Sequence, residues 1–283
     1  ELSNRQKVLE AKNLKTYFSI NKSLFGKATD FVKAVDDVSF DVYEGETLGL
    51  VGESGCGKTT LGRTILRLVE PTSGIISYKK HDITNVSDKE LRALRSDMQI
   101  IFQDPYSSLN PQITIGEAIM EPMRVHGLYN SDRERKDKAM DLIKRVSMTE
   151  QQFYRYPHEF SGGQRQRVCI ARALALNPHF IICDESVSAL DVSVQAQVLN
   201  LLNDLKKEFK FTYIFISHDL SVVKFMSDRM IVMNKGKIEE MGNADDICNN
   251  PQSEYTQKLI NSIPKGRLED IRTSIDKKKE LAV

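Results

Sequence analysis

The apolar residues of this chain form two patterns, short continuous runs and helical spacings, which alternate along much of its length. The runs at 47–51, 180–183, 213–216 and 231–233 have the length of buried strands. An amphipathic helix is predicted between the second and third runs, with Val194, Val198, Leu201, Leu202 and Leu205 on one face. Short buried strands that alternate with helices predict a parallel β-sheet covered on both faces, and so an α/β fold.

The N-terminal part and the middle of the chain follow other patterns. Residues 8–43 are rich in strand formers, with a turn-like interruption at 21–30. Residues 104–177 instead carry helical spacings, one of which starts at the capping box 131–134 and another of which runs from 163 to 176. The sequence therefore predicts an α/β core that a helical segment interrupts.

Charge and cysteine content narrow the class of protein. The 283 residues include 40 Lys and Arg against 39 Asp and Glu, a net charge of +1. This balance argues against a nucleic-acid partner. The four cysteines form no C-x-x-C pair, which is typical of a reducing compartment. Because no apolar run approaches the roughly 20 residues that cross a bilayer, we expect a soluble, cytosolic protein. The polar tail from residue 264 is expected to be loosely ordered.

Residues 52–59, which we name the phosphate loop, have the form G-x-x-x-x-G-K-[ST]. The loop lies between a predicted strand and a helical pattern, so bound phosphates would lie at a helix N-terminus, where the helix dipole favours anions. Its glycines allow a tight turn whose N–H groups point at phosphate oxygens. Lys58 can reach the β- and γ-phosphates, and the Thr59 hydroxyl can ligate Mg²⁺. The expected phosphate-binding residues are Gly52, Ser54, Gly55, Cys56, Gly57, Lys58, Thr59 and Thr60.

A phosphate loop of this kind needs a second carboxylate for Mg²⁺ and a group that orients water. Asp184 and Glu185 follow the buried run at 180–183, at the carboxyl end of a strand, where open α/β sheets bind ligands. Asp184 would belong to the metal shell, and Glu185 would polarise a water toward the γ-phosphate. Alone, such a pair is usually a helix N-cap or a surface pair; beside a phosphate loop the functional interpretation is favoured.

Further segments resemble motifs of the ATP-binding-cassette (ABC) ATPases. Residues 160–167 resemble the family signature, with Phe160 where a leucine is usual, and Gln103, the turn 188–191 and His218 follow the family's order. The resemblance covers about residues 8–263. It implies a P-loop NTPase (RecA-like) core with an antiparallel β subdomain and an inserted α-helical subdomain. The implied domains are 1–103 with 178–263 for the core, 104–177 for the helical signature subdomain and 264–283 for a flexible tail.

The resemblance also implies a head-to-tail dimer that encloses two ATP molecules. One cassette would supply the catalytic residues Lys58, Gln103, Glu185 and His218, with Thr59, Gln103 and Asp184 around Mg²⁺. The other cassette would supply the signature residues Ser161, Gly162, Gly163 and Gln164. An aromatic ring would stack on adenine: Phe18 by spacing, Tyr17 as the second choice, the alternative being that both rings are strand core. Cys56 and Cys183 would lie beside this site, so bulky thiol reagents should inhibit and MgATP should slow inhibition.

Residues 52–57, 104–111, 156–160 and 250–264 together resemble one branch, the ATP-binding subunits of bacterial peptide importers of the oligopeptide, dipeptide and nickel group. The chain most resembles the second of their two cassettes, with 21–31 as its long N-terminal insertion. This implies a peripheral ATPase at the cytoplasmic face of the membrane, with MgATP as fuel. Its partners would be two membrane-spanning permease subunits, a sister ATPase or a second copy, and an extracellular or periplasmic solute-binding protein.

Three alternatives stay open at this point. The cargo could be nickel or another small solute in place of a peptide, the chain could be a soluble ABC ATPase outside transport, or it could bind ATP without hydrolysing it. The helical segment should receive a helix of a membrane subunit. The expected groove residues are Tyr106, Leu109, Ile115, Ile119, Pro122 and Met123, with packing inside the segment as the alternative for each.

Overall fold

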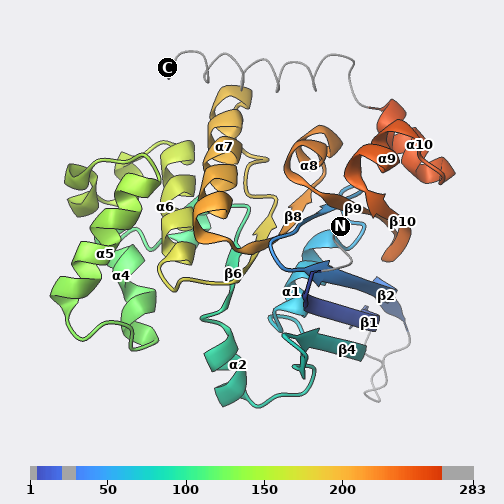
Figure 1. The fold of residues 1–283 in the computed structure, drawn as a ribbon, viewed down its shortest axis with the longest axis horizontal. Coiled ribbons are helices and arrows are strands. Elements are labelled where there is room, and N and C mark those ends of the chain that lie inside the picture. The colour runs from blue at the N-terminus through green and yellow to red at the C-terminus, as the bar shows by residue number, and fades with distance from the viewer. Residues whose placement is uncertain (1–4, 21–29, 263–283) are drawn as a thin grey trace. The chain divides into compact units, whose positions relative to one another are not determined.

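The computed structural model describes residues 5–20 and 30–262, which divide into two compact units (Figure 1). Of the described residues, 5–20, 30–92 and 212–262 belong to the first unit, and 93–211 belong to the second. The expected flexible tail and nearly all of the expected interruption at 21–30 lie outside the described residues. No described helix is both long enough and apolar enough to cross a bilayer.

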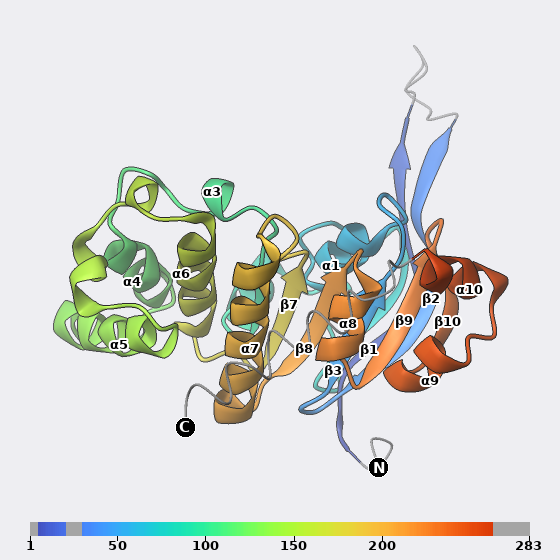
Figure 2. The same ribbon diagram turned by 90° about the horizontal axis from the view of Figure 1, so that it is seen from above.

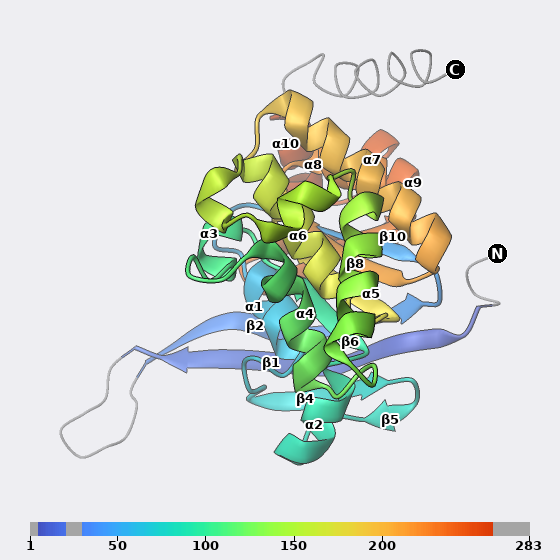
Figure 3. The same ribbon diagram turned by 90° about the vertical axis from the view of Figure 1, so that its left-hand side faces the viewer.

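An antiparallel sheet forms one layer of the first unit. Its strands are β1 (Lys7–Ser19), β2 (Phe31–Tyr43), β4 (Ser73–Tyr78) and β5 (His81–Asp82), in the order β2-β1-β4-β5 (Figure 3). Figure 2 shows β1 and β2 side by side along their length. The buried side chains of β1 and β2 are mostly aliphatic: Val8, Leu9, Ala11, Leu14, Val35, Val38 and Val42. The predicted β structure of residues 8–43 is confirmed.

The second sheet of the first unit is mainly parallel. Its strands in the first unit are β3 (Thr47–Val51), β8 (Thr212–Ser217), β9 (Arg229–Asn234) and β10 (Lys237–Asn243), in the order β10-β9-β3-β8. β3 is parallel to both β8 and β9, and all its residues are buried, as the apolar run predicts. β10 is antiparallel to β9 and was not predicted, because its residues alternate between half-buried and exposed and carry no apolar run. The predicted strands of this sheet are parallel, and β10 adds an antiparallel edge strand to them.

Helix α1 (Lys58–Ile65) joins the two layers of the first unit, since it contacts β1 and β2 on one side and β8 on the other. The first unit also contains α8 (Leu220–Met226), α9 (Ala244–Asn249) and α10 (Glu254–Asn261). α8 lies close to β3: a Cβ added at Gly49 would lie 2.3 Å from Val223 Cγ1. α2 (Asp88–Leu94) begins at the predicted Ser87 capping box, in which Glu90 accepts a hydrogen bond from the Ser87 N–H at 2.9 Å.

The second unit holds the parallel strand pair β6 (Met98–Ile101) and β7 (Phe180–Asp184) and a set of helices. The helices are α3 (Pro105–Ser108), α4 (Ile115–Val125), α5 (Asp132–Arg145), α6 (Gly162–Leu174) and α7 (Val192–Phe209), with short 3₁₀ helices at Glu150–Tyr154 and Pro157–Glu159. α4, α5 and α6 contact one another (Figure 1). The predicted stripe of α5 and the residue after it is fully buried: Ala139, Leu142, Ile143 and Val146.

Most of the expected groove residues belong to this helical core. Leu109, Ile115, Ile119 and Met123 are at most 3% exposed, so they pack inside the unit and cannot receive a helix from outside. For these four residues the alternative, packing inside the segment, therefore holds, and the groove is not lined by them. Apolar residues at helical spacing predict a buried face, but the spacing does not say which neighbour covers that face. Tyr106 differs, with 64% of its surface exposed.

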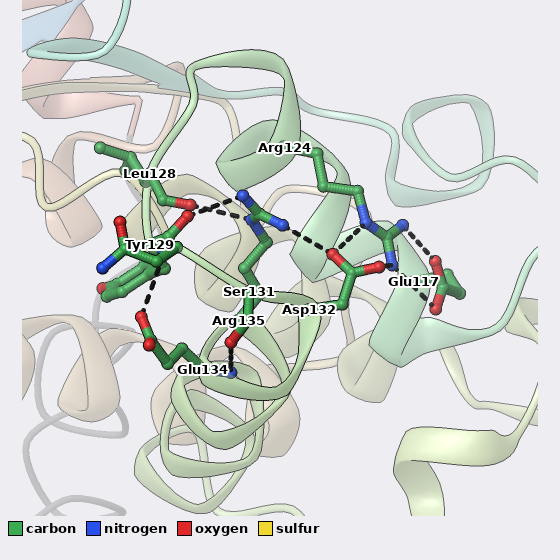
Figure 4. Close-up of polar contacts among 9 residues, drawn as sticks. Glu117, Arg124, Leu128, Tyr129, Ser131, Asp132, Glu134 and Arg135 are labelled. Carbon is green, nitrogen blue, oxygen red and sulfur yellow. Dashed lines mark hydrogen bonds and ion pairs between the residues drawn. The ribbon is translucent and has the colours of Figure 1, made fainter.

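Two arginines join α4 to the start of α5 (Figure 4). Arg124 of α4 forms ion pairs with Glu117 and with Asp132. Arg135 of α5 also pairs with Asp132, and it donates to the main-chain carbonyls of Leu128 and Tyr129 at 2.8 and 2.7 Å. Exposed ion pairs contribute little individually, but here they share Asp132 and satisfy carbonyls after the end of α4. The network holds the turn between the two helices.

Candidate nucleotide-binding site

The phosphate loop connects β3 to α1 in the first unit, as predicted. Its shape depends on two glycines that lie very close to main-chain carbonyl groups of other segments. A Cβ added at Gly52 would lie 2.2 Å from the carbonyl oxygen of Met233, and one added at Gly57 would lie 2.0 Å from that of Ala34. Gly57 also has a φ of +106°, in the region that favours glycine. The Gly236 N–H donates to the Cys56 carbonyl at 2.9 Å and so fixes the loop to the β9–β10 turn.

Lys58 is folded back on the loop and is only 3% exposed. Its ammonium donates to the carbonyl oxygens of Gly52 at 2.8 Å and Glu53 at 2.9 Å. A buried ammonium needs acceptors, and the loop carbonyls supply them here. The Cys56 thiol is also buried, which raises its pKa, while the nearby Lys58 opposes that rise.

His218 lies at the same edge of the sheet as the phosphate loop. β3 and β8 are parallel with Val51 opposite Ser217, so the residues that follow both strands leave the sheet at one edge. The turn after β8 is fixed by Ser217, which accepts from the Asp219 N–H at 3.0 Å, and by Asp219, which caps α8 through the Ser221 N–H at 3.0 Å. His218 itself is exposed. Lys58, Thr59 and His218 thus follow strands that end at the same edge of the sheet in the first unit.

Gln103 and Glu185 meet in the second unit, although 82 residues separate them. Gln103 Nε2 donates to Glu185 Oε2 at 3.2 Å and to Ser188 Oγ at 3.4 Å. The meeting follows from the register of the parallel pair, in which Ile101 faces Cys183, so both segments leave at the same ends of β6 and β7. Glu185 has a φ of +47°, a left-handed conformation that is uncommon for a residue other than glycine. Asp184, the last residue of β7, is 3% exposed.

The signature segment forms the start of α6, also in the second unit. Ser161 is the N-cap: its hydroxyl accepts from the Gln164 N–H at 3.3 Å, while Gln164 Oε1 accepts from the Ser161 N–H at 3.1 Å. Gly163 has a packing role that the motif alone does not reveal, because an added Cβ would lie 2.3 Å from Val194 Cγ1 of α7. Phe160 is 5% exposed, so the apolar side chain expected at this position is buried.

The two candidate adenine-stacking rings differ in their surroundings. The Tyr17 hydroxyl donates to Asp36, which raises the pKa of Tyr17 to about 12, and the Lys33 ammonium lies 5.4 Å from its ring centroid. Phe18 is paired with Val32 across the β1–β2 ladder and is 44% exposed. Neither ring is core, and Phe18 has the more accessible surface.

Two residues that contact the phosphate loop were not among the predicted site residues. Gly236 holds Cys56 by a main-chain bond, and Tyr255 of α10 accepts from the Glu53 N–H at 3.2 Å. Tyr255 lies in the segment that supported the importer branch, but its spacing of 202 residues from Glu53 gives no sign of contact. A main-chain bond such as that of Gly236 leaves no trace in side-chain patterns.

Comparisons with known proteins identify the family of this chain. The ABC transporter family model matches residues 35–188. The oligopeptide transport ATP-binding protein AppF of Bacillus subtilis (strain 168) is 52% identical over 266 residues, which are 94% of this chain and 80% of AppF. The glutathione import ATP-binding protein GsiA of Salmonella typhimurium (strain LT2) is 52% identical over 257 residues, and the chain spans only 41% of its length.

Solved structures give the same result for the fold. The ATP-binding cassette MJ0796, in a dimeric post-hydrolysis state bound to ADP and Pi, is 30% identical with a TM-score of 0.73, covering 83% of this chain and 98% of that one. The cbiO1 protein of Clostridium perfringens, part of the transporter complex cbiONQ, is 25% identical with a TM-score of 0.75, covering 93% of this chain and 99% of that one. The predicted α/β P-loop NTPase fold is confirmed, and the chain belongs to the ABC transporter family, as an ATPase of that family.

Proposed function

We propose that this chain is the ATP-hydrolysing subunit of a peptide importer and acts at the cytoplasmic face of the membrane. The similarity to AppF over 94% of the chain supports this proposal, as does the Gln103–Glu185 pair. AppF is named for oligopeptide transport and GsiA for glutathione import, and glutathione is itself a small peptide. A small peptide is therefore the cargo class that we favour over nickel.

The site would be completed by a second cassette arranged head to tail. One cassette would supply the phosphate loop, Gln103, Asp184, Glu185 and His218, and the other would supply residues 161–164. The N-terminus of α6 suits a γ-phosphate, because its N–H groups and the helix dipole favour anions. Closure around ATP would then move the permease subunits, and hydrolysis would reopen the dimer. Phe18, or else Tyr17, would stack on adenine.

The donors of the proposed metal site fit Mg²⁺. The Thr59 hydroxyl, the Asp184 carboxylate and the amide oxygen of Gln103 are hard oxygen ligands, the kind that Mg²⁺ prefers. In the described contacts the Gln103 nitrogen donates to Glu185, so its amide oxygen is the atom suited to a cation. When bound, the ion would neutralise charge on the β- and γ-phosphates.

Glu185 carries the chemistry in this proposal and is the residue to change. As general base, its carboxylate would take a proton from the attacking water, and Gln103 would hold it in position through the 3.2 Å hydrogen bond. Glu185→Gln should therefore lower steady-state ATPase turnover by about 10²–10⁴-fold while leaving ATP binding intact. The variant should also accumulate as an ATP-bound dimer, visible by size-exclusion chromatography with light scattering.

Glu121→Gln is the matched control, since Glu121 is an exposed carboxylate of α4 in the same unit. It should leave turnover unchanged. Unchanged turnover in Glu185→Gln would rule out the general-base role. The cargo is tested separately, with the chain and its permease subunits in vesicles that are offered oligopeptide, glutathione or Ni²⁺. Uptake of Ni²⁺ alone would overturn the peptide assignment.

A further inference from the structure

A hydrogen bond joins helix α10 to the phosphate loop. The N–H of Glu53, the second residue of the loop, donates to the hydroxyl of Tyr255 at 3.2 Å. Both residues belong to the first unit. Tyr255 is half-buried, and burial raises the pKa of its hydroxyl. A side chain from the C-terminal part of the chain therefore satisfies a main-chain donor of the nucleotide-binding loop.

The position of Tyr255 is itself fixed by the strand before it. Glu240 of β10 accepts from the main-chain N–H groups of Gln252 at 3.0 Å and Ser253 at 3.1 Å. Ser253 in turn caps α10, accepting from the Tyr255 N–H at 3.2 Å. Thr256, the next residue, is fully buried. The first turn of α10 is thus attached to the sheet immediately before the tyrosine, so its ring is held at a defined place.

Glu53, which donates its N–H to Tyr255, also accepts a hydrogen bond from Lys58. The Glu53 carbonyl accepts from the Lys58 ammonium at 2.9 Å and from the Cys56 N–H at 3.2 Å. In the proposed binding of phosphate, Lys58 would turn from this carbonyl toward the phosphate oxygens. The bond to Tyr255 is made at the N–H of Glu53 and does not involve the lysine. It can therefore hold the start of the loop in place after Lys58 has left.

We propose that Tyr255 is a positioning residue that keeps the phosphate loop in its nucleotide-binding shape, through the Glu53 N–H. This inference rests on the proposed binding of nucleotide phosphates by residues 52–59. Glu240 supports it at one remove, because it fixes the turn that carries Tyr255. Tyr255 has no part in the chemical step, so it acts on nucleotide affinity and not on turnover at saturation.

Tyr255→Phe removes the hydroxyl and keeps the ring, which separates the hydrogen bond from packing. Loss of one hydrogen bond between neutral groups should raise the Kd for MgADP by about 3- to 10-fold, as measured by titration calorimetry on the full chain. In the chain assembled with its permease subunits, the KM for ATP should rise by a similar factor while kcat changes less than about twofold.

Tyr43→Phe is the matched control. Tyr43 lies before β3 and the phosphate loop lies after β3, so the length of this strand separates Tyr43 from the loop. This control should leave the Kd and the KM unchanged. If Tyr255→Phe binds MgADP as wild type does, or more tightly, the inference is overturned while the proposed function stands. If the wild-type chain binds no MgADP, the proposed function fails first.

A double-mutant cycle with Glu240→Ala tests the attachment of α10. Loosening the first turn of α10 should weaken MgADP binding by the same route, so Tyr255→Phe should add less than its own single effect in the Glu240→Ala background. Fully additive effects would contradict the link between Glu240 and Tyr255. Thermal unfolding of both single variants shows whether the folded state is retained. A fall in both kcat and melting temperature, with no change in KM, would also overturn the positioning role.

Discussion

The starts of α1 and α6 are two candidate anion sites that are built in opposite ways. The N-cap of α1 is Gly57, which has no side chain to cap the helix, and its loop is shaped by contacts with the backbone of Ala34, Met233 and Gly236. The start of α6 is capped by its own residues, Ser161 and Gln164. The first helix start therefore depends on residues distant in sequence, whereas the cap of the second is local. Replacing the N-cap glycine should damage the first, and replacing the capping serine should damage the second.

The largest effect is expected from matched glycine substitutions. Gly57→Ala would place a Cβ 2.0 Å from the Ala34 carbonyl oxygen at a φ of +106°, which should lower the free energy of unfolding by about 2–6 kcal/mol and abolish nucleotide binding. Gly162→Ala meets only Leu190 Cδ2 at 3.6 Å, so stability should change by less than about 1 kcal/mol. Urea denaturation measures both. Equal losses would show that the two helix starts do not differ in this way.

A smaller effect separates the two sites by ligand protection. Cys56 of the phosphate loop and Cys169 of α6 are both buried, and burial raises the pKa of Cys169 to about 11. Reaction with a maleimide requires local opening, so MgADP at ten times its Kd should slow labelling of Cys56 about tenfold. Cys169 should label at the same rate with and without nucleotide, as followed by peptide mass spectrometry. Protection of both thiols to the same degree would indicate stabilisation of the whole chain, and no protection of Cys56 would place it outside the site.

The smallest effect concerns the cap of α6. Ser161→Ala removes the acceptor for the Gln164 N–H and should lower the free energy of unfolding by about 1 kcal/mol. Ser161→Asp keeps an acceptor at the N-cap and should recover most of that loss. Chemical denaturation of the full chain measures both. A neutral alanine substitution would mean that the local cap does not stabilise α6, and the contrast with α1 would then be lost.

The sequence predicted the parts of the fold that apolar patterns specify. The buried strands β3, β7 and β8 and the stripe of α5 are where the runs place them, because burial on both faces or on one helical face leaves a regular pattern. β10 was missed because an edge strand with alternating polar residues has no such pattern. The apolar residues of α4 were assigned to a docking groove, although Ile115, Ile119 and Met123 are buried in their own unit.

The site shows a similar division. Motifs identify the phosphate loop, Glu185 and Ser161, since the chemistry restricts residue type and spacing together. The Gln103–Glu185 hydrogen bond depends on strand register, which no motif records. The bonds from Gly236 to Cys56 and from Glu53 to Tyr255 join segments far apart in sequence, through at least one main-chain group. Such contacts follow from the fold and become visible only in the structure. The division into domains at 103, 177 and 263 stays a prediction.

The bonds of Lys58 to its own loop make nucleotide binding an exchange reaction. Its ammonium leaves the carbonyls of Gly52 and Glu53 only when an incoming group offers stronger acceptors. The two loop carbonyls thus compete with phosphate oxygens for the Lys58 ammonium. ADP and ATP offer the lysine a second phosphate, which AMP lacks. We therefore expect the resting loop to bind ADP and ATP more tightly than AMP.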